Sequence, residues 1–143
     1  MINELHIKYK DVKLPPELVK MFADIIEADE VTKKICFHIG KTERNQRTEE
    51  SNIRGITITD IVDNVMVDRK TKVGKGRTFT YEENKTNIHR KTAERHVDKL
   101  LDMSLLFYKP IKPYKFLFLT IRGWQVVQEL LNRRQNEEKH QHR

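Results

Sequence analysis

One segment, RKTAERHVDKLLDM at residues 90–103, constrains the fold of this chain more than any other part. At about 100° per residue, its apolar side chains share one arc of a helical wheel, as expected of a buried helix face. They are Ala93, Val97, Leu100 and Leu101. The opposite arc is polar and mostly cationic, and it holds Lys91, Thr92, Arg95 and Lys99. The segment therefore predicts a helix that packs on the core with one face and presents positive charge with the other.

Positive charge gathers around this helix. Residues 68–115 contain 13 Lys and Arg against 6 Asp and Glu, whereas the remaining residues contain 15 of each kind. The whole net charge of +7 therefore lies on one third of the chain. Clustered positive charge is typical of nucleic-acid binding, because each neutralised phosphate releases condensed counterions. A basic face that only keeps the protein in solution is the alternative, and the clustering favours binding.

A β-hairpin with a basic tip is predicted after this helix. Residues 105–108 and 115–119 are strand-like, and the two prolines between them cannot donate hydrogen bonds to a ladder. Three lysines surround the turn, namely Lys109, Lys112 and Lys115. Most aromatic residues of the hairpin suit core packing, whereas Tyr108 and Tyr114 beside the prolines suit contact with a sugar or a base.

Residues 1–40 are expected to form a strand and two helices. The alternation of apolar and polar residues in ELHIKYKDV predicts a half-buried strand. Two prolines, Pro15 and Pro16, then open a helix, where a missing N–H costs little. The apolar stripe of this helix comprises Leu18, Met21, Phe22, Ile25 and Ile26. A second helix is expected to end at Gly40, and residues 41–54 have almost no apolar anchor, which predicts a mobile surface loop.

The next helix starts at Thr57, because this residue and Asp60 can cap the first free amides of a helix. Its apolar period fades near Arg69, and an insertion follows near residues 67–85. The insertion contains two glycines and the cations Lys70, Lys72, Lys75 and Arg77. It suits an arm that follows a phosphate backbone, and it equally suits a disordered, solvated loop.

A closing helix is expected over residues 120–132, with Thr120 as its cap. Its apolar stripe comprises Trp124, Val127, Leu130 and Leu131. Residues 133–143 are too polar to pack and are expected to form a flexible tail.

Length and composition predict one soluble globular domain over residues 1–143. No apolar run approaches the roughly 20 residues of a membrane helix, and the N-terminus lacks an apolar signal core. Cys36 is the only cysteine, so no intramolecular disulfide can form. We therefore expect a cytoplasmic protein without membrane contact.

Residues 57–131 resemble a winged helix-turn-helix DNA-binding domain, as found in small regulators of the MarR, ArsR and PadR type. The segment TITDIV at 57–62 resembles the first motif helix, and RKTAERHV at 90–97 resembles the start of the recognition helix. The segment LLDMSLL at 100–106 resembles the following turn, and FLT at 118–120 resembles the end of the wing.

Three features depart from the family pattern. Ser104 occupies a turn position where the family usually has glycine, and the insertion lengthens the motif. His89 stands where a small hydroxyl cap is usual, although Asn87 could cap the helix instead.

The resemblance implies an α+β, mainly helical fold with a two-stranded β-wing, and sequence-specific binding of double-stranded DNA by a transcriptional regulator. Repression by occlusion of the site is the simplest mechanism for a chain of this length. Spare apolar surface on residues 5–26 and 124–131 predicts a homodimer. Helix 90–103 would enter the major groove, with Lys91 and Arg95 on guanine edges and Thr92 near a phosphate or thymine methyl. Wing 109–115 would lie on the flanking backbone or minor groove. The expected DNA-binding residues are Asn87, Arg90, Lys91, Thr92, Arg95, Lys99, Lys109, Lys112, Lys115, Lys75 and Arg77.

Two other functions fit the same fold. One is a plasmid or phage replication-initiation or partition protein that binds repeated DNA sites, and the other is a winged-helix protein-interaction module. The concentration of basic charge on the predicted recognition helix and wing favours DNA over a protein partner.

Catalytic and metal sites have weaker sequence support. Cys36 and His38 do not have a zinc-site spacing, and neither do His89 and His96. The E-x-K pattern of some nucleases occurs at residues 83–85, but it is short and frequent by chance. We therefore expect no enzymatic activity, no cofactor and no metal.

Overall fold

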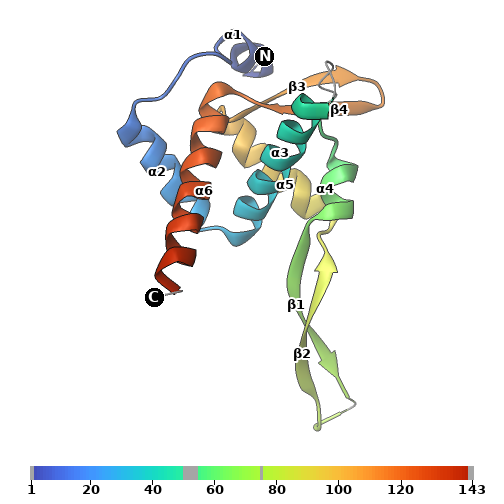
Figure 1. The fold of residues 1–143 in the computed structure, drawn as a ribbon. Helices are drawn as coiled ribbons and strands as arrows, with labels where there is room; N and C mark the ends of the chain where they lie inside the picture. The colour runs from blue at the N-terminus through green and yellow to red at the C-terminus, as the bar shows by residue number, and fades with distance from the viewer. Residues whose placement is uncertain (1, 50–54, 75, 142–143) are drawn as a thin grey trace.

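The computed structural model describes residues 2–49, 55–74 and 76–141, and in these ranges the chain is mainly helical with two separate antiparallel hairpins (Figure 1). The helices are α1 (Ile2–Lys8), α2 (Pro16–Glu27), α3 (Glu30–Glu49), α4 (Ile58–Asn64), α5 (Arg90–Asp102) and α6 (Ile121–Gln141). The strands are β1 (Met66–Val73), β2 (Thr80–Asn87), β3 (Leu106–Ile111) and β4 (Tyr114–Leu119). The α+β class expected from the sequence is confirmed.

The core forms around α3, which contacts α2, α4, α5, α6 and β4. Each of these elements contributes side chains that are almost fully buried, among them Ile26, Ile35, Ile39, Ile61, Leu100, Leu117 and Leu130. Ile56 forms an isolated antiparallel bridge with Leu117, so a very short third strand lies beside β4. The bridge connects the segment before α4 to the β3–β4 hairpin, and α5 packs against both α3 and α4.

The N-terminal segment is a helix, so the strand predicted there is wrong. The Asn3 side chain hydrogen-bonds both the N–H and the carbonyl of Tyr108, at 3.0 Å each, and thereby satisfies an edge of β3. His6 is buried and lies 2.7 Å from the Ser104 hydroxyl. Leu5 and Tyr9 are exposed. The apolar alternation therefore does not mark a buried face, and the polar residues provide the contacts.

The helix predicted from Pro16 is confirmed, but only part of its apolar stripe is buried. Val19, Ala23 and Ile26 face the core, whereas Leu18, Met21 and Ile25 are exposed by 38%, 44% and 51%. Packing of α2 against α3 and α6 thus uses one side of the apolar arc. The other side forms an exposed apolar face at the edge of the molecule.

Helix α3 continues past Gly40 to Glu49, so its predicted end and the predicted loop at 41–49 are wrong; residues 50–54 lie outside the described residues. Gly40 is buried, and a Cβ there would lie 2.9 Å from the Val127 side chain, so α3 and α6 approach closely. Beyond Gly40, polar side chains attach α3 to neighbouring segments. The buried Glu43 carboxylate accepts the Leu119 N–H at 3.0 Å, and the Gln46 side chain bonds both backbone groups of Gly55.

The capping box at the start of α4 is confirmed. The Thr57 hydroxyl accepts the Asp60 N–H at 3.2 Å, and the Asp60 carboxylate accepts the Thr57 N–H at 3.3 Å. The helix ends at Asn64, earlier than predicted, because the chain turns into β1. The predicted insertion is therefore an antiparallel hairpin, which projects well away from the helices (Figure 1).

Helix α6 extends to Gln141, so the prediction of a flexible tail is wrong for residues 133–141, while 142–143 lie outside the described residues. Arg133 explains part of this extension, since its guanidinium pairs with Asp24 at 2.7 Å and Glu27 at 3.5 Å on α2. The N-terminal cap of α6 is Thr120, as predicted, and its hydroxyl accepts the Gly123 N–H at 3.1 Å. Among the described residues, no helix is long and apolar enough to cross a membrane.

Candidate nucleic-acid interface

Helix α5 is held on the core by the apolar face that the sequence predicts and by one buried histidine that it does not. Ala93, Val97 and Leu100 are buried. His96 is also buried, and its Nδ1 lies 2.8 Å from the Thr32 hydroxyl and 3.2 Å from the Asp29 carboxylate. Burial lowers the pKa of His96, and the nearby Asp29 opposes this shift. In the sequence, only the spacing of His96 three residues after Ala93 indicates that the His96 side chain lies on the buried face of the helix.

The charge on the outer face of α5 changes from positive to negative along the helix. Lys91 and Arg95 are exposed near the start of the helix, and neither makes an ion pair within the described part of the chain. Asp98 and Asp102 occupy the exposed face further along. A polyanion that approached this helix would therefore meet free cations at the N-terminal half and repulsion at the C-terminal half.

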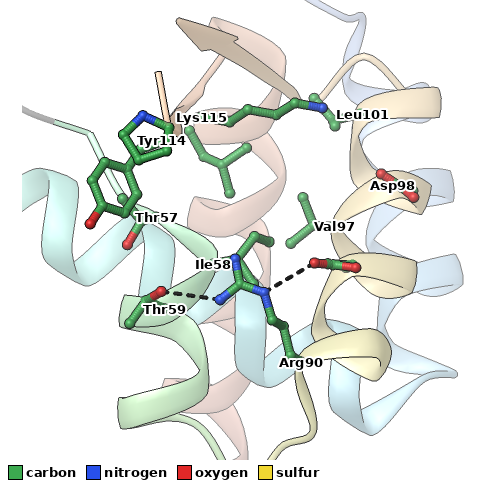
Figure 2. A pocket seen from close by; sticks show the side chains of 12 residues that line it. Thr57, Ile58, Thr59, Arg90, Val97, Asp98, Leu101, Tyr114 and Lys115 are labelled. Carbon is green, nitrogen blue, oxygen red and sulfur yellow. Dashed lines mark hydrogen bonds and ion pairs between the residues drawn. The ribbon is translucent and has the colours of Figure 1, made fainter. Parts of the chain in front are cut away.

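Two of the expected DNA-binding cations of α5 already have partners. Arg90 donates to the Thr59 hydroxyl at 3.2 Å and to the Glu94 carboxylate at 3.3 Å, so it connects α5 to α4 (Figure 2). The Lys99 ammonium donates to Asp29 at 3.2 Å. Exposed pairs of this kind are worth roughly 0–1 kcal/mol, so exchange for a phosphate would cost little. Thr92 is half-buried, so it is less accessible than the outer-face position that the sequence predicted for it.

A groove of about 370 Å³ separates α5 from the start of α4 and from β4. Figure 2 shows Arg90 and Thr59 at one end of it and Tyr114 and Lys115 at the other. Its charged lining residues are Arg90, Glu94, Asp98 and Lys115. Because both signs are present, the groove does not form a pocket for a free anion, and it continues the outer face of α5 toward the β3–β4 hairpin.

The three lysines of the β3–β4 hairpin are all exposed, as expected, but they do not share one face. Lys115 lies opposite Pro110 and lines the groove, with its ammonium 4.8 Å from the Tyr108 ring centroid. The Lys109 ammonium lies 5.2 Å from the centroid of the Phe118 ring. Lys109 pairs with Phe116 and Lys115 pairs with Pro110, so the two lysines are offset by one residue along the ladder. Because successive side chains of a strand alternate between its faces, Lys109 and Lys115 lie on opposite faces of the hairpin. Lys112 lies at the turn.

Asn87 has a different role from the one predicted. Its side-chain amide donates to the carbonyls of Val62 and Asp63, at 2.8 and 3.3 Å, and so closes the end of α4. It does not cap α5, whose N-cap is His89, and His89 makes no side-chain capping bond. Asn87 therefore positions the root of the β1–β2 hairpin. The sequence predicted that Asn87 contacts DNA, whereas in the structure its side-chain amide is engaged by the end of α4.

The remaining expected DNA-binding residues belong to the far end of the β1–β2 hairpin. Arg77 is exposed in the turn between the two strands, and Lys75 lies outside the described residues. This turn is far from α5 in Figure 1. The structure therefore does not bring Arg77 together with Lys91 and Arg95 into one compact site.

The turn after α5 tolerates Ser104 where the family that the sequence resembles has glycine. Its φ of 58° lies in the left-handed region, which costs a non-glycine residue free energy. Arg122 offsets this cost by donating to the Ser104 hydroxyl at 2.7 Å and to its carbonyl at 3.1 Å. The same carbonyl accepts the Thr120 hydroxyl at 2.9 Å. The turn thus joins α5, β3 and α6 through polar contacts.

Within the residues that the structure describes, no three His, Cys, Asp or Glu side chains are arranged to hold a metal ion. Cys36 is buried, and burial raises the pKa of its thiol to about 12. The thiol is therefore protonated at neutral pH and acts as a small core side chain rather than a ligand or nucleophile.

Comparison of the chain with protein-family models, with curated proteins and with solved structures finds no match. The function therefore has to be inferred from the residues of this chain and their arrangement.

Proposed function

We propose that the chain is a winged helix-turn-helix protein that binds double-stranded DNA and regulates transcription. In this assignment α4 and α5 form the motif, β3 and β4 form the wing, and the Ile56 bridge is the short strand beside the wing. The observation that carries the proposal is the pair of exposed cations at the start of α5, which make no ion pair with another described residue, together with three exposed lysines on the β3–β4 hairpin at the far end of the groove beside α5.

The outer face of α5 can enter a major groove, which is wide enough to admit a helix. In that pose Lys91 and Arg95 reach base edges, and Arg is suited to bidentate contact with guanine. The acidic half of the helix then leaves the groove, since Asp98 and Asp102 lie at its C-terminal end. Lys112 and Lys115 of the wing reach the flanking backbone, which positions the protein without specifying sequence.

The proposed protein acts as a homodimer that occludes its site. A second copy would dock on the exposed apolar face of α2, formed by Leu18, Met21 and Ile25. In Figure 1 α2 lies on the opposite side of the molecule from α4 and the β1–β2 hairpin, so this contact leaves α5 free. A two-fold axis there would place two recognition helices on half-sites about one helical turn apart. A light-scattering mass of one chain at micromolar concentration would contradict the dimer.

Fluorescence anisotropy across a salt series tests DNA binding directly. The probes are a labelled random-sequence duplex of about 30 base pairs and its single strand. The double substitution Lys91→Ala/Arg95→Ala removes the free cations of α5, and Lys13→Ala/Lys20→Ala removes two exposed cations near α2 as a matched control.

The wild type and the control variant should bind the duplex with a steep salt dependence. A random duplex offers no specific base edges, so on it Lys91 and Arg95 contact phosphates. The α5 variant should therefore bind more weakly, with a log–log salt slope shallower by about 1 to 2, because each lost phosphate contact changes the slope by about 0.9. An absence of duplex binding even at low salt would overturn the proposal, and so would an equal loss in the α5 and control variants.

A further inference from the structure

The β1–β2 hairpin makes few contacts with the rest of the protein. Every described side chain from Lys70 to Lys85 is exposed, and partial burial is limited to Val67 and Thr86 near the root. An isolated two-stranded hairpin is marginally stable in water, because it has no third strand or helix to cover a face. Such a projecting element would gain stability from a partner that covers it.

The root of the hairpin is fixed relative to α5. The Ile88 N–H donates to the Val65 carbonyl at 3.1 Å, and both of these side chains are buried. The bonds from Asn87 to the end of α4 add to this closure. The hairpin therefore leaves the core beside the start of α5, where Lys91 is exposed.

Its charge is distributed unevenly. Near the root, Asp68 lies opposite Lys85 and Lys70 lies opposite Glu83, so the charges balance across the strands. Residues 71–81, which include the turn and the strand ends beside it, contain three Lys and Arg residues and no Asp or Glu. The unbalanced positive charge therefore lies toward the end of the hairpin that is further from the core.

Exposed aromatic and apolar side chains accompany this charge. Val73 and Tyr81 are exposed by 42% and 62%, and the Tyr81 ring lies edge-on to Phe79 at a centroid distance of 5.5 Å. Aromatic rings among cations are typical of surfaces that contact nucleic acid, where rings pack on sugars and bases. An acidic protein surface would match the charge but does not require the rings.

In space, α5 lies between the two hairpins. Figure 1 shows β3–β4 at one end of the molecule and β1–β2 extending from the other end. Each strand of β1–β2 has 8 residues, which corresponds to a length of about 26 Å at about 3.3 Å per residue. That length corresponds to roughly eight base pairs at 3.4 Å each.

We infer that the β1–β2 hairpin is a second DNA-binding arm, which lies on the same duplex as α5, on the side opposite the wing. A two-stranded ribbon fits a major groove, and the cations of the far half neutralise backbone phosphates. The arm extends the binding site in one direction by about eight base pairs. This inference rests on the proposed DNA-binding function.

A charge variant tests the arm without disturbing the fold. Lys70→Ala/Arg77→Ala changes two exposed cations of the arm, and Lys13→Ala/Lys20→Ala serves as the control with the same loss of charge. In the anisotropy salt series on the random duplex, the arm variant should lower the log–log slope by about 1 to 2 relative to the control. Equal slopes in the two variants would overturn the inference.

A shortened arm tests its reach. Replacement of residues 70–83 by an Asn-Gly turn keeps the root pairing and removes the far half of the hairpin. Circular dichroism should show an intact helical core. With a series of duplex lengths, the shortest duplex that binds tightly should be about four base pairs shorter than for the wild type, because four of the eight residues of each strand are removed.

The outcomes distinguish a failure of the proposed DNA-binding arm from a failure of the proposed DNA-binding function. An unchanged minimal length, together with weakened binding by Lys91→Ala/Arg95→Ala, would overturn the arm and leave the proposed function standing. A failure of every variant and of the wild type to bind duplex DNA would overturn both. Preferential loss of single-strand binding in the arm variant would also overturn it, because it would assign the arm to unpaired nucleic acid.

Discussion

The two hairpins of this protein have similar net charge, but β3–β4 is packed against the core whereas β1–β2 is attached only at its root. In β3–β4, the strand ends near α6 are buried through Leu106, Phe107, Leu117, Phe118 and Leu119. In β1–β2, the exposed pattern continues almost to the root. The first hairpin is therefore part of the folding unit, and the second is an appendage whose amides should open at low free energy cost. Their comparison shows that a basic hairpin can be positioned either by core packing or by its root alone.

The largest expected effect comes from the anchored hairpin. Leu117 is 2% exposed and its backbone pairs with Ile56 in both directions. Leu117→Ala should lower the free energy of unfolding by about 2–5 kcal/mol, because it leaves a cavity between β4 and the core. Urea unfolding followed by circular dichroism measures this change.

Tyr81→Ala on β2 is the matched control for Leu117→Ala. Its side chain is 62% exposed, so the free energy of unfolding should stay within about 0.5 kcal/mol of the wild type. Comparable destabilisation by the two substitutions would show that β1–β2 is packed, and the contrast between the hairpins would be lost.

A smaller effect is expected at the turn that leads into β3. Ser104→Ala removes the hydroxyl that bonds Arg122 and keeps the left-handed backbone, whereas Ser104→Gly removes the hydroxyl and relieves the strain. The glycine variant should therefore be more stable than the alanine variant by about 1 kcal/mol. Thermal unfolding of the pair measures the difference. Equal stabilities would mean that the turn relaxes when its hydroxyl is absent.

The root of β1–β2 has a comparable polar anchor in Asn87. Asn87→Ala removes two hydrogen bonds to the end of α4 and should lower stability by about 1 kcal/mol. Hydrogen exchange should accelerate throughout β1–β2, while protection in β3–β4 stays unchanged. Faster exchange in both hairpins would contradict the independence of the appendage.

The smallest effect concerns the pH dependence of the β4 anchor. Burial raises the pKa of Glu43, whose carboxylate accepts the Leu119 N–H. The folded chain therefore holds this proton more tightly than the unfolded chain, so the stabilisation is present at low pH and is lost as the pH rises through the raised pKa.

Glu43→Gln isolates this dependence, because it keeps an oxygen acceptor for the Leu119 N–H and cannot titrate. The melting temperature of the wild type should fall relative to that of the variant as the pH rises from the ordinary pKa range of a glutamate through the raised pKa of Glu43. Parallel pH profiles of the two proteins would contradict the assignment.

Much of the candidate site was predictable from local patterns. The two faces of α5 follow from its helical period, and the capping box of α4 follows from the spacing of Thr57 and Asp60. The β3–β4 hairpin and its exposed lysines follow from strand-like segments around a proline-containing turn. The partners of Arg90 and Lys99 were not predictable, because Thr59 and Asp29 are distant in sequence.

Three of the wrong predictions share one cause. Residues 41–49 and 133–141 have few apolar side chains, yet both are helical, since Glu43, Gln46 and Arg133 find polar partners on other elements. The N-terminal helix is held in the same way by Asn3 and His6. Apolar periodicity detects burial against a core and carries no information about long-range polar contacts.

By itself, the sequence determined where this protein has a basic amphipathic helix, a capped helix before it and a basic hairpin after it. Each of these depends on residues within one or two turns of one another. Only the tertiary structure decided that the insertion is a projecting hairpin, that it leaves the core beside the start of α5, and that α5 lies between two hairpins of different anchoring. Those features depend on contacts between segments that are distant in the sequence. A local sequence pattern carries no information about the free energy of closing the long loops between them.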